Sequence, residues 1–150
     1  MNSCLTEYCS SSPQDTEAFG KRLACCLGPG SVIALSGGLG AGKTCLVKGL
    51  ACALGIGENI TSPTYTIINE YRLDGGRLNG LCLYHIDAYR LNGDEDFDST
   101  GAGECFSAGG ITIIEWSDRI PLSVPADAIR IDIEISGPQS RIFRVRGLEL

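Results

Sequence analysis

The feature that most constrains this chain is a glycine-rich segment, GGLGAGKT at residues 37–44, that lies between two regular elements. The segment matches the pattern G-x-x-x-x-G-K-[ST]. Residues 31–36 before it hold a short, continuous apolar run, which is typical of a strand buried on both faces. The apolar residues after it recur at helical spacing: Leu46, Val47, Leu50, Ala51 and Leu54. The order of strand, glycine-rich turn and helix is the context that a phosphate-binding loop requires.

Each residue type in this loop suits the binding of phosphate. Glycines let the backbone curl so that several N–H groups point at one anion. A helix that begins near Gly42 adds the positive end of its dipole. In this motif Lys43 reaches the β and γ phosphates, where we expect it to act in catalysis, and the Thr44 hydroxyl ligates Mg²⁺. The residues expected to contact a bound nucleoside triphosphate are Gly37, Gly38, Leu39, Gly40, Ala41, Gly42, Lys43, Thr44 and Cys45.

The remaining pattern predicts an α/β fold of the P-loop NTPase type, as one domain over residues 1–150. We expect a mixed, mostly parallel central sheet flanked by helices, with a C-terminal antiparallel hairpin at its edge. A first helix begins at Ser12-Pro13 and stops before Gly28-Pro29-Gly30. Further strands are expected at residues 5–10, 64–73, 81–86 and 111–116, and the hairpin at residues 129–136 and 141–145.

The segment from Asn92 to Gly110 is acidic and glycine-rich, with weak periodicity. It is either a mobile surface region or a segment that carries one poor helix. Asp98-Ser99-Thr100-Gly101 within it fits D-x-x-G, but it does not follow a strand, so we attribute the match to chance. The chain has no N-K-x-D sequence, so guanine specificity of the GTPase kind is not supported.

Two acidic residues stand at the ends of predicted strands. Asp87 follows the strand that ends with His85-Ile86, and Glu115 ends the apolar strand that begins at Ile111. Parallel strands beside the glycine-rich loop would bring both carboxylates to the same edge of the sheet. Mg²⁺ needs oxygen ligands and hydrolysis needs a group that orients water, so both residues are candidates for these tasks. The alternative for each is a solvated acid at a strand end, and His85 alone is more typical of packing.

Composition limits the classes of binding partner and the cellular compartment that we expect for this chain. The net charge of −6 disfavours direct binding to nucleic acid, because phosphate contacts need Lys and Arg. Eight cysteines without a C-x-x-C pair favour free thiols over a zinc site or a disulfide framework. Neither a signal-peptide pattern nor a run of 18 apolar residues is present. We therefore expect a reduced cytoplasmic protein without a membrane span.

Four motifs in order resemble the TsaE (YjeE) family of bacterial P-loop ATPases. These motifs are LSGGLGAGKT at 35–44, SPTYTI at 62–67, YHIDAYRL at 84–91 and IEWSDRI at 114–120. The resemblance covers nearly the whole chain. It implies a weak ATPase that acts with the TsaD and TsaB proteins in making N6-threonylcarbamoyladenosine at position 37 of tRNA. The transferase chemistry would then lie in TsaD, and tRNA would be reached indirectly through the complex.

The resemblance also implies roles for individual residues. Thr44 and Glu115 would hold Mg²⁺, and Asp87 in the H-x-D motif would position or activate the attacking water. Residues 62–64 would form a switch-like loop near the γ-phosphate, and Trp116 would pack close to the nucleotide. Contacts with partner proteins are expected from residues 62–66 and from the segment 92–110.

Two positions depart from the family pattern. Gly38 stands where the family usually has Asp, so an acid near the phosphates is absent. Cys45 replaces a usual second Thr. A thiol at a helix N-terminus can have a lowered pKa, which would make the ATPase sensitive to oxidation. The alternative for Cys45 is inert filling of apolar space.

Two other functions are compatible with a phosphate-binding loop. A small-molecule kinase would need an acceptor pocket and a lid with arginines over the phosphates. The chain has arginines near its C-terminus, but on the hairpin pattern: Arg130, Arg141, Arg144 and Arg146. A nucleotide-gated binding module without catalysis is the third possibility.

Overall fold

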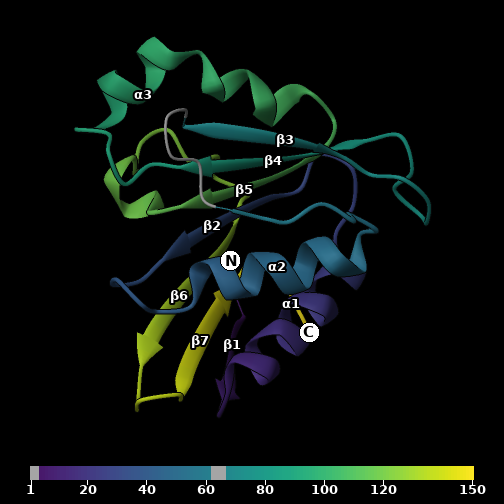
Figure 1. Ribbon diagram of the computed structural model, residues 1–150. Coiled ribbons are helices and arrows are strands. Elements are labelled where there is room, and N and C mark those ends of the chain that lie inside the picture. The colour runs from purple at the N-terminus through teal and green to yellow at the C-terminus, as the bar shows by residue number, and fades with distance from the viewer. Residues whose placement is uncertain (1–3, 62–66) are drawn as a thin grey trace.

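The computed structural model describes residues 4–61 and 67–150. The described residues form a seven-stranded sheet in the order β1-β7-β6-β2-β5-β4-β3, with helices on both faces (Figure 1). The strands are β1 Leu5–Ser10, β2 Val32–Ser36, β3 Ile68–Arg72, β4 Cys82–Asp87, β5 Ile111–Glu115, β6 Ile129–Ile135 and β7 Arg141–Arg146. The helices are α1 Pro13–Cys25, α2 Lys43–Ala53 and α3 Asp94–Thr100, with the 3₁₀ helices η1 Ala102–Ser107 and η2 Ser117–Arg119. The expected strand at 64–73 is shorter, and its residues 64–66 lie outside the described residues.

The centre of the sheet is parallel. β2 pairs in parallel with both β5 and β6, and β5 pairs in parallel with β4. β3, β7 and β1 are added by antiparallel pairing, and β1 thereby runs in the same direction as the central strands. The predicted mixed, mostly parallel sheet is thus confirmed. Because the central strands are parallel, their carboxyl ends meet at one edge, next to the glycine-rich loop.

The predicted C-terminal hairpin forms from β6 and β7, but it does not supply the outermost strand. β6 pairs with β2 inside the sheet, and β1 pairs along the whole of β7, from Leu5 opposite Arg146 to Ser10 opposite Arg141. The edge on this side is therefore β1, and the strand expected at residues 5–10 is present. The pairing of β1 with β7 joins the two ends of the chain, a contact that no local pattern could specify.

One face of the sheet is covered by α1 and α2 (Figure 1). Ser12 caps α1, because its hydroxyl accepts a hydrogen bond from the Asp15 N–H at 3.1 Å. The two helices cross at very short range at Gly20 and Gly49, where an added Cβ would lie 2.4 Å from the Leu46 carbonyl oxygen and 2.1 Å from the Glu17 carbonyl oxygen, respectively. This crossing holds the start of α2, and with it the glycine-rich loop, against the sheet.

The opposite face of the sheet packs against α3, η1 and the segment 120–128. Residues of β2 alternate between the two faces: Ile33 and Leu35 belong to the core under α1 and α2, and Val32 and Ala34 to the second core. The segment 92–110 is held by Phe97, which is 1% exposed in that second core. Of the two alternatives for this segment, the structure has the helix, followed by a 3₁₀ turn. The described helices are all too short or too polar to cross a membrane.

Candidate nucleotide site

The glycine-rich loop connects the end of β2 at Ser36 to the start of α2 at Lys43. Gly42 immediately before the helix has a φ of 97°, a left-handed conformation that residues with a Cβ rarely adopt. Gly37 has a φ of 154° and lies so close to β6 that a Cβ would be 2.9 Å from the Ile133 carbonyl oxygen. These glycines let the chain turn tightly from the strand into the helix, so the helix N-terminus faces the end of the sheet.

Lys43 is folded against the loop that precedes it. Its Nζ donates hydrogen bonds to the carbonyl oxygens of Gly37 at 2.6 Å and Gly38 at 2.9 Å. The ammonium group also lies 3.9 Å from the ring centroid of Trp116, which is a cation–π distance. Burial lowers the pKa of Lys43, and the nearby carboxylate of Glu115 partly opposes this effect. The result is a positive charge held at the mouth of the loop with little contact with solvent.

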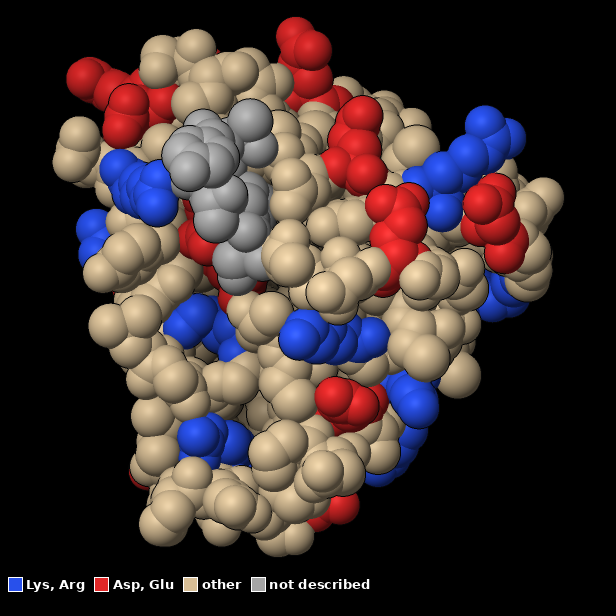
Figure 2. Space-filling view, in the orientation of Figure 1, with Lys and Arg blue, Asp and Glu red and all other residues tan. Residues whose placement is uncertain are grey.

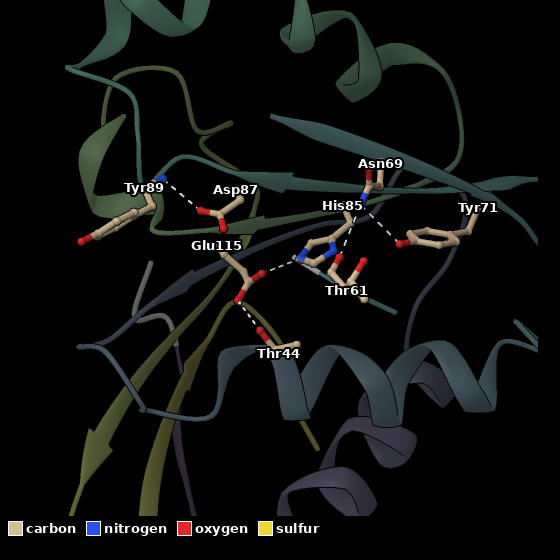
Figure 3. A network of polar contacts seen from close by, with 8 residues as sticks. All are labelled: Thr44, Thr61, Asn69, Tyr71, His85, Asp87, Tyr89 and Glu115. Atoms are coloured by element: carbon tan, nitrogen blue, oxygen red, sulfur yellow. Dashed lines mark hydrogen bonds and ion pairs between the residues drawn. The ribbon is translucent and has the colours of Figure 1, made fainter. Parts of the chain in front are cut away.

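The two predicted acidic residues are direct neighbours across the sheet. Asp87 is opposite Glu115 in the register of β4 and β5, and Glu115 is also opposite Leu35 at the end of β2. The Thr44 hydroxyl donates a hydrogen bond to Oε1 of Glu115 at 3.3 Å, which joins α2 to the strand ends (Figure 3). Together with the loop these residues border a cleft of about 380 Å³. Its lining comprises Leu39, Gly40, Ala41, Gly42, Lys43, Thr44, Cys45, Asp87, Tyr89, Glu115 and Trp116.

His85 contacts the other oxygen of the same carboxylate. Its Nε2 lies 2.6 Å from Oε2 of Glu115, and the two side chains are 0% and 3% exposed (Figure 3). Within the part of the chain that the structure describes, Nδ1 of His85 has no hydrogen-bond partner. The sequence interpretation of His85 as a packing residue was therefore incomplete. The H-x-D spacing could have indicated this contact. Residues two apart on a strand share a face of the sheet, so His85 lies on the same face as Asp87, and Asp87 is the register partner of Glu115.

Asp87 is half-buried at the end of β4. Its Oδ1 accepts a hydrogen bond from the Tyr89 N–H at 2.9 Å. Burial raises the pKa of Asp87, and the hydrogen bond from Tyr89 partly opposes this rise. A carboxylate with a raised pKa, set beside a phosphate-binding loop, has the properties of a base that accepts a proton from water.

Aromatic side chains form one wall of the cleft. Trp116, which follows β5, has a φ of 58°, and the described residues include no other non-glycine residue with a positive φ. Its ring lies 4.9 Å from that of Tyr89, and the Arg119 guanidinium lies 5.1 Å from the Tyr89 centroid. The indole therefore lies over the Lys43 ammonium group on one side and packs against the second core as well.

The donor set at the cleft suits Mg²⁺. The Thr44 hydroxyl and the Glu115 carboxylate are hard oxygen donors that lie within hydrogen-bonding distance of each other, so one ion can contact both. Among the described residues there is no cluster of three or more His, Cys, Asp or Glu side chains suited to a metal. This is compatible with Mg²⁺, which keeps several waters and is usually shared between one or two protein ligands and substrate phosphates.

The structure distinguishes between the two alternatives for Cys45. Burial raises the pKa of the Cys45 thiol, which contradicts the lowered pKa of the redox-sensitive alternative. The thiol is half-buried and donates to the Pro13 carbonyl oxygen at 3.3 Å, which favours the alternative of inert packing. At Gly38 an added Cβ would meet nothing within 4 Å, so space is not the reason that this position lacks an acid.

The C-terminal arginines do not form a lid over the cleft. Arg144 pairs with Glu134 at 2.7 Å and with Glu7 at 3.7 Å, and Arg146 pairs with Asp132 at 3.5 Å. Among the described residues no arginine lines the cleft. Arg141 instead donates hydrogen bonds to the Ala41 and Gly40 carbonyl oxygens of the glycine-rich loop, a contact that no local sequence pattern indicates.

Comparisons with known proteins agree with one another. A family model described as "Threonylcarbamoyl adenosine biosynthesis protein TsaE" matches residues 10–143. The "tRNA threonylcarbamoyladenosine biosynthesis protein TsaE" of Treponema pallidum is 45% identical over 136 residues, which cover 91% of this chain and 96% of that protein. The protein of the same name from Bacillus subtilis is 39% identical over 130 residues, 87% of this chain and 78% of that one. The crystal structure of YdiB from Bacillus subtilis superposes with a TM-score of 0.78 at 33% identity, covering 99% of this chain and 89% of that one.

Proposed function

This chain belongs to the TsaE family, and on that premise we propose that it is the ATP-binding and weakly hydrolysing subunit of the machinery that makes threonylcarbamoyladenosine in tRNA. The observation that carries the proposal is one cleft bordered by the glycine-rich loop, Asp87 and Glu115. A protein with a purely structural role would have no need to gather a buried lysine and two carboxylates there. Buried charges are costly unless they are paired or bind a ligand, and titratable groups with shifted pKa values that gather in a cleft are characteristic of functional sites.

In the proposed reaction water attacks the γ-phosphorus of ATP, the bond to the β–γ bridging oxygen breaks, and ADP and inorganic phosphate are released. Lys43 binds the β and γ phosphates and balances the negative charge that develops there. Asp87 accepts a hydrogen bond from the attacking water and takes its proton, a task to which its raised pKa contributes. Trp116 and Tyr89 form one wall of the cleft.

Mg²⁺ would be held by Thr44 and Glu115 and would neutralise charge on the phosphate oxygens. His85 fixes the orientation of Glu115 from the side away from Thr44. A carboxylate held at both oxygens presents its remaining lone pairs in a constant direction, which favours a precise ligand geometry.

The partners we propose are TsaD and TsaB homologues in the cytoplasm, with tRNA contacted through them. The charge of the chain supports this arrangement. Lys and Arg side chains on the face drawn in Figure 2 lie in separate groups divided by acidic and uncharged surface. The net charge of −6 likewise disfavours direct binding to the phosphate backbone of tRNA.

Reconstitution tests the proposal. The chain is mixed with TsaD and TsaB homologues and tRNA, with and without ATP, and both complex formation and the modified nucleoside are measured. We expect modification to need this chain and ATP, and to fail with Lys43→Ala. The absence of association in either nucleotide state, or modification that proceeds equally without the chain, would contradict the proposal. Transfer of the γ-phosphate to a small acceptor would favour a kinase instead.

A further inference from the structure

Arg141 makes more backbone contacts than a strand residue needs. It is the first residue of β7, and its guanidinium donates to four carbonyl oxygens. Two belong to the hairpin turn: Nη1 donates to Gly137 at 2.9 Å and to Ser140 at 2.8 Å. Two belong to the glycine-rich loop, about 100 residues earlier in the chain: Nε donates to Ala41 at 3.1 Å and Nη2 to Gly40 at 2.8 Å.

The other arginines of β7 show what is unusual about this one. Arg144 and Arg146 pair with carboxylates on neighbouring strands, as exposed strand residues commonly do. Arg141 instead uses the planar fork of its guanidinium to join two backbone segments, and a charged donor makes such bonds stronger than neutral ones. The guanidinium of Arg141 therefore links the hairpin turn to the glycine-rich loop.

The contact at Ala41 sets the direction of a binding group. In a planar trans peptide the N–H points away from the carbonyl of the same unit. The Ala41 carbonyl shares its peptide unit with the N–H of Gly42, the residue before the first turn of α2. A guanidinium that holds this carbonyl on one side of the loop therefore turns the Gly42 N–H to the opposite side, toward the anion that such a loop binds.

We propose that Arg141 is a positioning residue of the phosphate-binding loop. It holds the loop in its binding conformation from behind and makes nucleotide affinity depend on the β6–β7 turn at residues 136–140. The inference rests on the proposed nucleotide binding. Two simpler roles compete with it: Arg141 could act only through its charge near the phosphates, or only as a staple of the hairpin.

The experiment compares wild type with Arg141→Ala, Arg141→Lys and the matched control Arg144→Ala on the same strand. ADP is titrated in the presence of EDTA and followed by the fluorescence of Trp116, the single tryptophan of the chain. Hydrogen exchange of a peptide spanning residues 38–46 is measured without nucleotide, together with the thermal midpoint of each variant. We expect at least tenfold weaker ADP binding for Arg141→Ala and at least threefold weaker binding for Arg141→Lys. Exchange in the loop should accelerate in both variants, and Arg144→Ala should match wild type in both readouts.

Several results would overturn the inference. Wild-type affinity in Arg141→Lys would show that only charge matters. A lowered thermal midpoint, with unchanged ADP affinity and unchanged hydrogen exchange in the loop, would show that Arg141 only stabilises the hairpin. If Arg141→Ala does not fold, Arg141→Lys decides by itself. Wild-type protein that binds no ADP would refute the proposed function, whereas the loop exchange, which needs no nucleotide, would still test the positioning role.

Discussion

Nε2 of His85 lies 2.6 Å from Oε2 of Glu115, and the Thr44 hydroxyl lies 3.3 Å from the other oxygen of the same carboxylate. β4, α2 and the end of β5 thus meet at one side chain, which is 3% exposed. A carboxylate so enclosed is costly to bury unless both of its oxygens have partners. His85 and Thr44 provide those partners, and the proposed magnesium site depends on the orientation they impose.

Removing the histidine partner should weaken the metal site without removing a ligand. In His85→Phe we expect the Mg²⁺ concentration for half-maximal ATP hydrolysis to rise about 10- to 100-fold, the usual cost of losing a group that orients a metal ligand. His85→Gln retains an N–H donor and should restore part of the loss. A Mg²⁺ titration of hydrolysis by the reconstituted complex measures both variants. An unchanged Mg²⁺ dependence in His85→Phe would show that Glu115 needs no orientation from β4.

Asp87 should matter for hydrolysis and little for binding. In Asp87→Asn we expect the hydrolysis rate in the complex to fall about 100-fold or more, because the amide cannot accept the proton of the attacking water. ATP affinity, measured by titration calorimetry, should change less than threefold. Full hydrolysis by Asp87→Asn would remove Asp87 from the mechanism and would favour a nucleotide-gated binding module.

The same substitution should stabilise the protein, in a manner that depends on pH. Burial raises the pKa of Asp87 in the folded protein, so over the range between its unfolded and folded pKa the folded state binds more protons than the unfolded state. The stability that this group contributes therefore falls as the pH rises from the ordinary pKa of aspartate through the raised pKa of Asp87 in the folded protein. Thermal unfolding without nucleotide or metal should give Asp87→Asn a higher midpoint than wild type at pH 7. The difference should shrink as pH is lowered toward the ordinary pKa of aspartate, and a constant difference would contradict this account.

The helix crossing that supports the loop should not tolerate one added methyl group. In Gly49→Ala the Cβ would lie 2.1 Å from the Glu17 carbonyl oxygen, so α1 and α2 must move apart. We expect a loss of about 2 kcal/mol in the free energy of unfolding and a thermal midpoint lower by roughly 4–8 °C. Gly28→Ala is the matched control, since an added Cβ there meets nothing within 4 Å. Equal midpoints for the two variants would refute the close crossing.

The local part of this fold could be predicted because its signals are local. The apolar run at 31–36, the glycine-rich loop and the periodic helix after it specify β2 and α2 with their connection. The expectation of parallel strands predicted that Asp87 and Glu115 lie at the same edge of the sheet. In the register of β4 and β5 the two residues are side by side. The order of motifs predicted the family, which the comparisons show.

The rest depends on contacts distant in sequence. Nothing near Leu5 indicates that β1 pairs with β7 at the edge of the sheet. Nothing near Arg141 indicates a contact with a loop about 100 residues away. His85 was undervalued because a single histidine carries no pattern, and its task appears only once the register of β4 and β5 is known. At Cys45 the sequence leaves two alternatives for the thiol, and the burial that decides the direction of the pKa shift is known only from the fold.

The account rests on the glycine-rich loop as a nucleotide site, and titration calorimetry with Mg²⁺-ATP tests it most directly. Wild type, Lys43→Ala and the control Arg144→Ala, which lies outside the cleft lining, are compared under the same conditions. We expect one site per chain in wild type and in the control, and binding at least tenfold weaker in Lys43→Ala, which corresponds to about 1.4 kcal/mol or more. No binding by wild type, or binding by Lys43→Ala equal to that of wild type, would contradict the assignment.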